Sequence, residues 1–329
     1  MAMISRSNME IKDSAALVRA IEEIAPYCAG WALTDKVGDI NRLASARQRI
    51  LAYKEFEIPK KSGGVRRITA PTGRLKGVLK CLSQILASYY KPHESAHGFI
   101  PGRSVASNAD VHVGKNYVLN IDLKDFFPSI SSQRIVRALR HLGLSHEIAE
   151  LISRLATIPT MKEGSDISIH ALPQGSPCSP ILSNMVCIDL DRRLSGLARR
   201  FRVDYTRYAD DMTFSSNRHV YSADGDFLEE LRQIVNECGF VINEKKTRLL
   251  KRGSRQEVTG ILVNTKRNSH RSFRKNLRTA VFSAETNGCT HREYMRIMGR
   301  ISYLSMLRGK EDPCVKRMQA IMSKVAVTK

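Results

Sequence analysis

The sequence has 329 residues, 42% of them hydrophobic, and a formal net charge of +21. A chain of this length and composition can bury a large core, which excludes a disordered, collagen-like or repeat protein. Charged residues interrupt every apolar run, and the N-terminus lacks a basic segment followed by an apolar one, so we expect neither a membrane span nor a signal peptide. The seven cysteines show no C-x-x-C spacing, which favours reduced thiols in a cytoplasmic protein over disulfides or a zinc site.

The residue pattern in the first third of the chain predicts helices followed by a hairpin. Residues 8–52 have apolar residues at helical spacing. Residues 53–59 and 65–71 are predicted strands around the turn KKSGG. Residues 74–90 then form an amphipathic pattern, which predicts a helix facing a core.

The middle of the chain mixes strands and helices. NYVLNIDLKDFFPSI (116–130) begins as a strand with one apolar face, and Asn120 and Asp122 lie on the other. Two helices are expected over 133–143 and 145–158, and the loop LPQGSPCSP (172–180) leads into one further amphipathic helix.

A hairpin over 203–215 comes next, before a helix near 225–238. GFVINEKKTRLL and EVTGILVN are predicted as two final strands, and residues 270–325 as basic helices. Because strands and helices do not alternate strictly, the sequence favours an α+β fold over a doubly wound sheet.

The stretch YTRYADDMTF (205–214) places two acids side by side. Neighbouring residues of a strand point to opposite faces, so Asp210 and Asp211 serve one site only if the chain turns there. With Asp122 on a solvent-facing strand position, they are candidates for a divalent-cation site, since Mg²⁺ prefers carboxylate oxygens. Two such ions can stabilise the attacking and leaving oxygens of a phosphoryl transfer. An adjacent acid pair by itself favours a plain turn, because Asp is a common turn residue.

The positive charge is concentrated at one end. From Lys245 to Lys329 there are 21 Lys and Arg against 5 Asp and Glu, a net charge of +16. A basic surface of this size indicates a polyanionic partner, of which nucleic acid is the usual one. A local acidic spot in such a protein could hold metal ions at a reacting phosphate.

Four motifs in order resemble those of reverse transcriptases: IDLKDFF, LPQGSPCSP, YADD and GFVINEKKT, within roughly residues 55–265. The resemblance implies a right-hand polymerase fold with fingers, palm and thumb. It implies N-terminal helices and fingers over 1–116, a palm with interleaved fingers helices over 117–265, and a basic helical thumb over 266–329.

The same resemblance implies a role for each matching residue. Asp122, Asp210 and Asp211 would be the catalytic, Mg²⁺-binding acids, and Phe127 the aromatic gate that favours deoxynucleotides. Two further residues would lie against the incoming nucleotide, namely Gln174 and Gly175.

Two basic positions have a neighbour that could act instead. Arg66 matches the arginine that meets the triphosphate, with Arg67 as the alternative. Lys246 matches the lysine that protonates the leaving pyrophosphate, with Lys245 as the alternative.

Two short patterns narrow the resemblance to bacterial retron reverse transcriptases. They are Asn108, Ala109 and His112, and Val258, Thr259 and Gly260. Members of that group bind a structured non-coding RNA and start DNA synthesis from an internal 2′-OH, which gives branched RNA-linked DNA (msDNA). They act in anti-phage defence, usually with an effector protein. The partners implied are thus this cognate RNA, its DNA product, deoxynucleotide triphosphates and an effector.

The predicted thumb carries a basic helix suited to RNA phosphates and 2′-hydroxyls. Its candidate RNA-binding residues are Arg271, Arg274, Lys275 and Arg278. The alternatives are another bacterial reverse transcriptase, group II intron-like or from another defence system, that primes differently, and a non-catalytic RNA-binding scaffold. The scaffold is disfavoured because all three acids remain.

Overall fold

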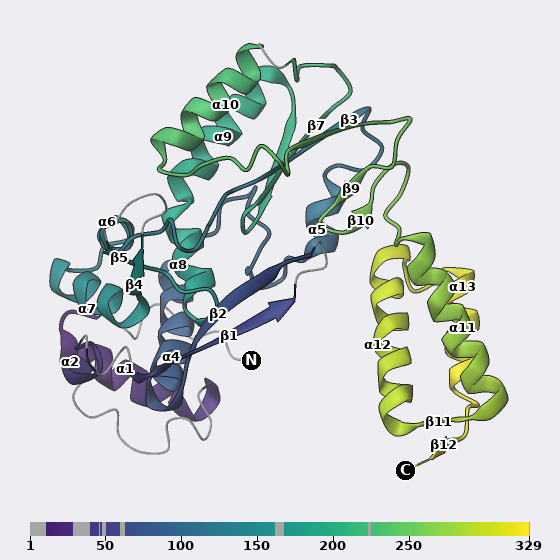
Figure 1. The fold of residues 1–329 in the computed structure, drawn as a ribbon, viewed down its shortest axis with the longest axis horizontal. Helices are drawn as coiled ribbons and strands as arrows, with labels where there is room; N and C mark the ends of the chain where they lie inside the picture. The colour runs from purple at the N-terminus through teal and green to yellow at the C-terminus, as the bar shows by residue number, and fades with distance from the viewer. Residues whose placement is uncertain are drawn as a thin grey trace. The chain divides into compact units, whose positions relative to one another are not determined.

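The computed structural model describes residues 11–28, 40–45, 47, 51–59, 63–161, 168–222 and 225–328. Figure 1 labels the helices and strands of the chain. By its internal contacts the chain divides into two compact units, each built from several segments. Unit 1 comprises residues 1–99, 123–194 and 232–242, and unit 2 comprises residues 100–122, 195–231 and 243–329. The division into N-terminal fingers, palm and thumb stays a prediction. No helix of the described residues is long and apolar enough to cross a bilayer.

Unit 1 is mainly helical and carries two small hairpins. Its helices are α1 (Ser14–Cys28), α2 (Ile40–Leu43), α4 (Gly73–Tyr89), α6 (Ser132–His141), α7 (His146–Ala156), α8 (Ser179–Val186) and the first part of α9 (Ile188–Phe201). Its hairpins are β1 (Tyr53–Pro59) with β2 (Val65–Pro71), and β4 (Ile158–Met161) with β5 (Ser168–Ala171). The apolar face of α4 is buried, and this helix packs on α1, α7 and α8.

Unit 2 is organised by one antiparallel sheet with the strand order β6–β7–β3–β8. These strands are β3 (Tyr117–Asp122), β6 (Asp204–Tyr208), β7 (Asp211–Ser216) and β8 (Arg248–Lys251). A short helix, α5 (Val105–Asp110), and the hairpin of β9 (Glu257–Val258) with β10 (Ile261–Leu262) also belong to this unit. Helix α10 (Asp226–Glu237) runs from unit 2 into unit 1.

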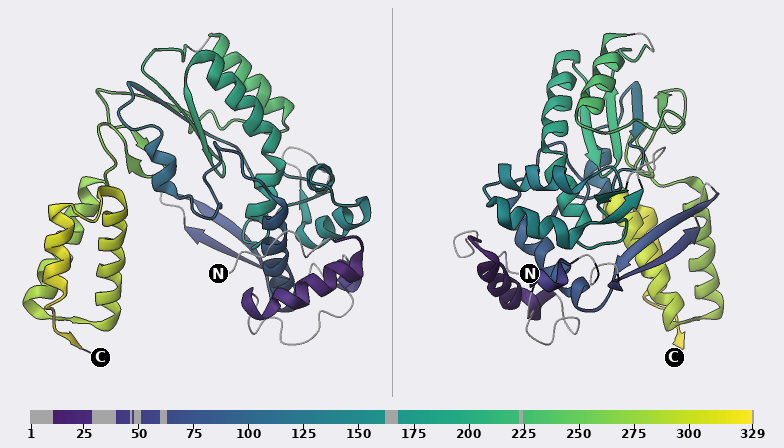
Figure 2. Two further views of the ribbon diagram at one scale, coloured as in Figure 1. Left: turned by 180° about the vertical axis from the view of Figure 1, so that it is seen from behind. Right: turned by 60° about the vertical axis from the view of Figure 1, so that its left-hand side comes forward.

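The C-terminal part of unit 2 is a group of three helices. They are α11 (Arg271–Asn287), α12 (His291–Arg308) and α13 (Pro313–Met322), with the short strands β11 (Cys289–Thr290) and β12 (Val327–Thr328) beside them. Figures 1 and 2 show the helices side by side, and their facing side chains form a common apolar core. This agrees with the predicted basic helices over 270–325.

Most predicted elements are present, with three corrections. Of the predicted strand GFVINEKKTRLL, only the part within Arg248–Lys251 is a strand, because residues 244–246 form a turn. The single helix expected after the Pro/Gly-rich loop is two helices, because the backbone leaves helical geometry at Cys187 between α8 and α9. EVTGILVN is a tight hairpin rather than one strand, because Thr259 and Gly260 both have positive φ and reverse the chain. The predicted turn at 60–62 and much of the helical prediction over 8–52 lie outside the described residues.

The two faces of the unit 2 sheet differ in chemistry. On one face Tyr205 and Phe214 are cross-strand partners whose rings stack at 4.7 Å, and Phe227 of α10 meets Phe214 edge-on at 5.5 Å. The other face is polar, because Asn120 and Thr213 are cross-strand partners there and share a hydrogen bond of 3.2 Å. Thr206, Thr213 and Ser215 of this polar face are themselves buried, whereas Asp211 at the end of β7 is exposed.

A buried histidine joins the polar face to the segment after α5. His112 is fully buried. Its Nδ1 lies 2.7 Å from Ser215 Oγ and its Nε2 lies 2.7 Å from Thr206 Oγ1. Both partners are on the polar face of the sheet, so this imidazole connects β6 and β7 to the α5 segment. The histidine of the N-A-x-x-H pattern is therefore part of the core.

We expect His112→Ala to lower the free energy of unfolding by about 2–4 kcal/mol, because it leaves a cavity and removes a hydrogen-bond partner from two buried hydroxyls. Urea denaturation would measure the change. His141→Ala is the matched control, since His141 lies exposed at the end of α6 and should change stability by less than about 0.5 kcal/mol. Equal stabilities of the two variants would show that the imidazole does not support the sheet.

Candidate active site

The acid pair lies at a two-residue hairpin. Tyr208 and Asp211 are the last cross-strand partners of β6 and β7, so Ala209 and Asp210 form the turn. Ala209 has φ +57°, a left-handed conformation that costs a residue with a Cβ roughly 1 kcal/mol. The buried Arg207 donates from Nη1 to the Ala209 carbonyl at 3.1 Å and thereby supports the turn. The chain does reverse at the acid pair, as a single site requires.

Strand β3 brings the third acid to the same place. Asp122 is the direct cross-strand partner of Asp211. Partners in an antiparallel pair point to the same face, with Cβ atoms about 4.5–5.5 Å apart. Asp210 precedes Asp211 in the turn, so three carboxylates are gathered at one end of the polar face. In the described residues no three His, Cys, Asp or Glu side chains converge closely enough to form a ready-made metal site.

One of the three carboxylates already has a cation beside it. Lys246 Nζ lies 3.0 Å from Asp122 Oδ1 and 2.9 Å from Asp122 Oδ2. The Asn243 side chain donates from Nδ2 to Asp122 Oδ1 at 3.0 Å, and the Asn243 backbone N–H donates to the Asp122 backbone carbonyl at 2.8 Å. Both candidate lysines are exposed, and Lys246 is the one whose ammonium group contacts Asp122.

The sequence analysis did not single out Asn243. Its signal was an asparagine three residues before Lys246, in a segment read as a strand. The structure has a turn there instead, in which the Lys246 amide donates to the Asn243 carbonyl at 3.0 Å. Asparagine is favoured at such turns, so turn chemistry could have identified this residue.

Crowding of the acids changes the pKa of one of them. The pKa of Asp211 is raised to about 7 by desolvation and by the negative charges of Asp210 and Asp122, while Lys246 opposes the shift. The Asp211 side chain still meets solvent, so a cation that enters from solution can reach it. A raised pKa means that the ionised carboxylate is disfavoured, and a bound cation would stabilise that ionised form.

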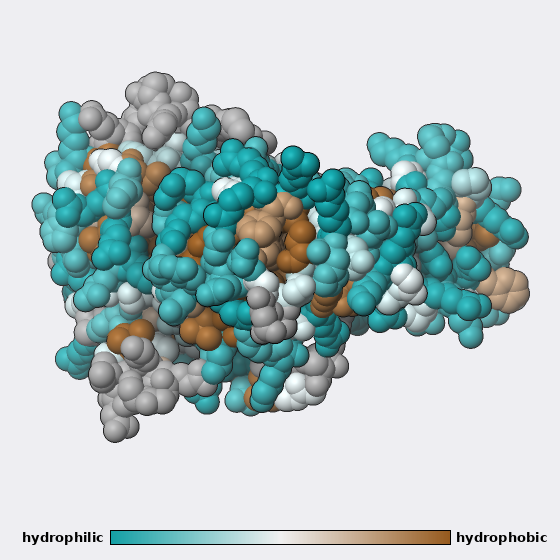
Figure 3. Space-filling model, turned by 90° about the horizontal axis from the view of Figure 1, so that it is seen from above, coloured by the Kyte–Doolittle hydropathy of each residue, from teal (hydrophilic) through white to brown (hydrophobic). Residues whose placement is uncertain are grey.

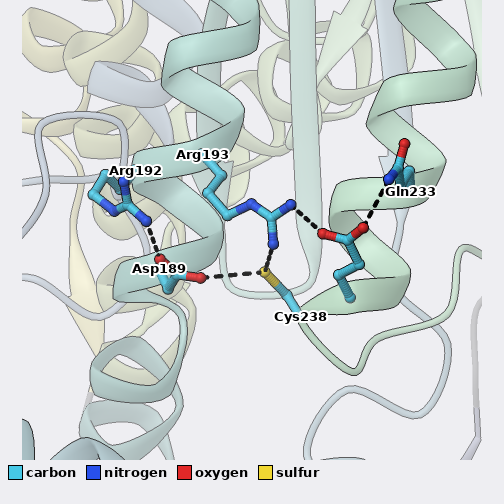
Figure 4. Close-up of polar contacts among 6 residues, drawn as sticks. Asp189, Arg192, Arg193, Gln233 and Cys238 are labelled. Atoms are coloured by element: carbon cyan, nitrogen blue, oxygen red, sulfur yellow. Dashed lines mark hydrogen bonds and ion pairs between the residues drawn. The ribbon is translucent and has the colours of Figure 1, made fainter.

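The chain that leads to Asn243 is anchored within unit 1. Arg193 of α9 donates to Cys238 Sγ at 3.9 Å (Figure 4) and also to Glu237, which accepts from Gln233 Nε2 at 2.8 Å as well. Arg134 of α6 donates to the carbonyls of Cys238 and Gly239, at 2.7 and 2.9 Å. These contacts fix the end of α10 and the residues that precede Asn243 in the sequence.

The Gln174–Gly175 loop lies against the β1–β2 hairpin. The Thr69 amide donates to the Gln174 carbonyl at 2.8 Å. Gly175 has φ +130°, and a Cβ built on it would lie 2.7 Å from Ile68 Cγ2 and 3.1 Å from the Thr69 carbonyl oxygen. Only glycine allows this approach of the loop to β2.

The two candidate arginines lie on opposite faces of the β1–β2 hairpin. Arg66 and Ile68 are two residues apart on β2 and share a face, whereas Arg67 lies on the other face and is the cross-strand partner of Glu57. The Ile68 side chain contacts Gly175, so Arg66 is on the face of the hairpin that turns towards the loop. Arg66 is exposed and able to meet a ligand.

The two adjacent phenylalanines have different environments. Phe126 is 4% exposed and stacks on Phe240 at 5.6 Å between ring centroids. Phe127 meets Phe126 edge-on at 5.3 Å and is only half-buried. Phe126 therefore belongs to the core, while part of the Phe127 ring remains accessible.

The basic residues of α11 and the retron-type patterns lie in unit 2. Arg271, Lys275 and Arg278 are exposed, whereas Arg274 Nη1 donates to Asn268 Oδ1 at 2.6 Å.

The two short patterns touch each other, because Asn108 Nδ2 lies 3.5 Å from Thr259 Oγ1. Ala109 and Val258 belong to one apolar cluster. Two motifs about 150 residues apart thus form one structural unit.

Gly175→Ala should displace the loop from β2, since the new methyl group would overlap Ile68 and the backbone is strained for alanine. We expect a loss of about 1–3 kcal/mol in the free energy of unfolding and faster hydrogen exchange of the Thr69 amide. Gly196→Ala is the control, because a Cβ on that α9 residue meets nothing within 4 Å. Unchanged exchange at Thr69 would mean that the contact is not formed in solution.

The sequence matches a known protein family and several characterised relatives. Residues 58–275 match the family described as reverse transcriptase (RNA-dependent DNA polymerase). Retron Mx65 reverse transcriptase of Myxococcus xanthus is 39% identical over 277 residues, which cover 80% of this chain and 64% of that protein. Retron Ec73 reverse transcriptase of Escherichia coli is 31% identical over 265 residues, covering 76% of this chain and 81% of that protein. The chain thus spans less than two thirds of the Mx65 protein.

A solved structure supports the predicted fold. Apo telomerase from Candida tropicalis aligns with a TM-score of 0.50 at 12% identity, covering 84% of this chain and 59% of that one. A likeness at this identity concerns the fold alone, and it agrees with the predicted α+β right-hand polymerase fold. With the matched family and the retron relatives, the chain belongs to the reverse transcriptases of the retron type.

Proposed function

We propose that this protein is an RNA-directed DNA polymerase that binds a cognate structured RNA and copies part of it into branched, RNA-linked DNA. The observation that carries the proposal is the cross-strand pairing of Asp122 with Asp211, with Asp210 in the adjoining turn. This pairing gathers three carboxylates at the end of two central strands in a strongly basic protein. A role in anti-phage defence with an effector protein follows from the retron resemblance.

The three acids fit Mg²⁺ as the metal. Their donor atoms are carboxylate oxygens, and the raised pKa of Asp211, caused by desolvation and by neighbouring negative charge, favours a cation at this position. Bound there, two such ions would supply charge stabilisation for the attacking and leaving oxygens. Asp122, Asp210 and Asp211 would hold them, and Asn243 would orient Asp122 through its amide.

Lys246 has two tasks in this proposal. Its ammonium group donates hydrogen bonds to both carboxylate oxygens of Asp122, and its positive charge reduces the repulsion among the three acids. The side chain is exposed for 60% of its surface, so it can swing to a nearby leaving group and donate a proton. Lys246 is therefore our choice over Lys245 as the general acid.

The incoming deoxynucleotide would be bound by residues of unit 1. Arg66 would contact the triphosphate, because it lies on the hairpin face that turns towards Gly175. Gln174 and Gly175 would present the loop backbone to the nucleotide. The accessible part of the Phe127 ring would occupy the space that a ribose 2′-OH requires.

Substitution of the acids tests the polymerase proposal. Asp211→Asn is expected to reduce DNA synthesis on a primed RNA template about a thousandfold or more, because it removes a metal-binding carboxylate. Asp204→Asn is the control, since Asp204 is on the same face of the sheet but pairs with Lys115 at the far end of β6. Asp211→Asn should unfold at no lower temperature than the wild type, because it removes one of three like charges. Wild-type synthesis by this variant would exclude the site.

The product of the reaction tests the retron-type priming. The same three acids can activate a 2′-OH or a 3′-OH, provided that the hydroxyl is held in line with the α-phosphate. With its own non-coding RNA, Mg²⁺ and deoxynucleotides, the wild type should make DNA joined to an internal nucleotide by a 2′–5′ bond. A debranching enzyme specific for that bond should release the DNA after RNase treatment. A 3′–5′ linkage, or a linkage to protein, would contradict retron-type priming and leave the polymerase proposal intact.

A further inference from the structure

Helix α11 has a core face and an exposed face of a particular composition. Leu277, Val281 and Ala284 are buried in the core shared with α12 and α13. At spacings of four, three and four residues, the opposite side carries Arg271, Lys275, Arg278 and Phe282. At 100° per residue these four side chains share one side of the helix. We call them the α11 stripe.

The aromatic residue of the stripe is not part of any core. Phe282 is 68% exposed, and the described residues give it no aromatic or cation–π partner. Phe273, on the same helix, is partly buried and meets Tyr303 edge-on at 5.5 Å. Figure 3 shows a mostly hydrophilic surface in which apolar side chains form small, separate groups. An exposed apolar side chain is common by itself, so the feature that distinguishes Phe282 is its position at the end of a row of cations on one side of the helix.

The cations of the stripe are not neutralised by the helix itself. Arg271, Lys275 and Arg278 are exposed, and within the described residues their side chains form no ion pair or hydrogen bond. Arg274 differs, because it bonds to Asn268. The helix contains one acid, Glu285, beyond the ring. At 1.5 Å per residue the stripe extends about 16 Å from Arg271 to Phe282.

Unpaired RNA fits this combination of groups. Its phosphates bind exposed cations, and its bases can leave the stack and lie on an aromatic ring, which paired bases inside a duplex cannot do. An apolar protein surface would cover Phe282 but would remove three cations from water without compensation. The charge of the stripe therefore favours nucleic acid over protein.

We infer that the α11 stripe binds an unpaired segment of the RNA, with Phe282 stacked on one base and the three cations on the flanking phosphates. The inference rests on the RNA binding proposed above and deepens it. It makes Phe282 the residue that distinguishes a loop from a paired stem, a task that the cations cannot perform because both forms carry phosphates.

Two synthetic RNA probes test this inference with the full-length protein. One is a hairpin whose loop contains 2-aminopurine, and the other is a fully paired duplex of the same stem. Affinity is measured at several salt concentrations, and 2-aminopurine fluorescence reports stacking. The variants are Phe282→Ala, Phe282→Trp and Lys275→Ala. Met161→Ala is the control, since Met161 is an apolar residue of comparable exposure (60%) in unit 1.

We expect Phe282→Ala to weaken hairpin binding about 5- to 150-fold, the range for losing one stacked base, and to leave duplex binding unchanged. Phe282→Trp, which keeps an aromatic ring, should bind the hairpin and quench the fluorescence as the wild type does, unlike Phe282→Ala. Lys275→Ala should weaken both probes and lower the slope of log affinity against log salt by about 0.7–0.9, whereas Phe282→Ala should leave that slope unchanged. Met161→Ala should behave as wild type.

Three results would overturn the inference. The first is unchanged hairpin affinity in Phe282→Ala, which would assign the ring to another partner, such as a protein. The second is an equal loss for hairpin and duplex, and the third is failure of Phe282→Trp to restore binding. If the wild type bound neither probe, RNA binding by α11 would fail as a whole. DNA synthesis on a primed template would still test the polymerase proposal separately.

Discussion

The register of β3 on β7 is the constraint on which the site depends. Asp122 and Asp211 belong to segments far apart in the sequence, and only direct cross-strand pairing places their carboxylates on one face. A shift by one residue would move Asp122 to the aromatic face. The stacked pair of Tyr205 and Phe214 on that face opposes such a shift, because it would expose apolar rings and bury charges. The core thus specifies the position of the acids without touching them.

Like charges at the site are balanced locally, in a protein whose overall charge has the opposite sign. Lys246 is bonded to Asp122, while Asp211 responds to desolvation and to its neighbours with a raised pKa. The basic surface can attract RNA over a distance, but it cannot hold a cation at the reacting phosphate. Both features are needed in a polymerase that copies a polyanion.

Periodicity was sufficient to predict β1–β2, α4, the strand of Asp122 and the hairpin of the acid pair, because each has a regular apolar pattern or a turn signal. It could not separate Arg66 from Arg67, since their difference depends on which face of the hairpin meets Gly175. Asn243 was missed for a similar reason, because its role depends on a contact with Asp122 across the fold. The prediction of one strand for EVTGILVN failed where a threonine takes a backbone conformation that propensity disfavours.

Two turns of unit 2 share that strain, and both fall on motifs that identified the family. Ala209 and Thr259 have φ of +57° and +46°, where local rules would place Gly, Asn or Asp. Each is supported by a side chain: Arg207 bonds to the Ala209 carbonyl, and Thr259 Oγ1 donates to the Val105 carbonyl at 3.4 Å. A β-branched residue in this region is a marked outlier. Thr259 Oγ1 also accepts a hydrogen bond from Asn108 Nδ2 at 3.5 Å, so this strained residue contacts both the Val105 carbonyl and the other retron-type pattern, a connection that glycine could not make.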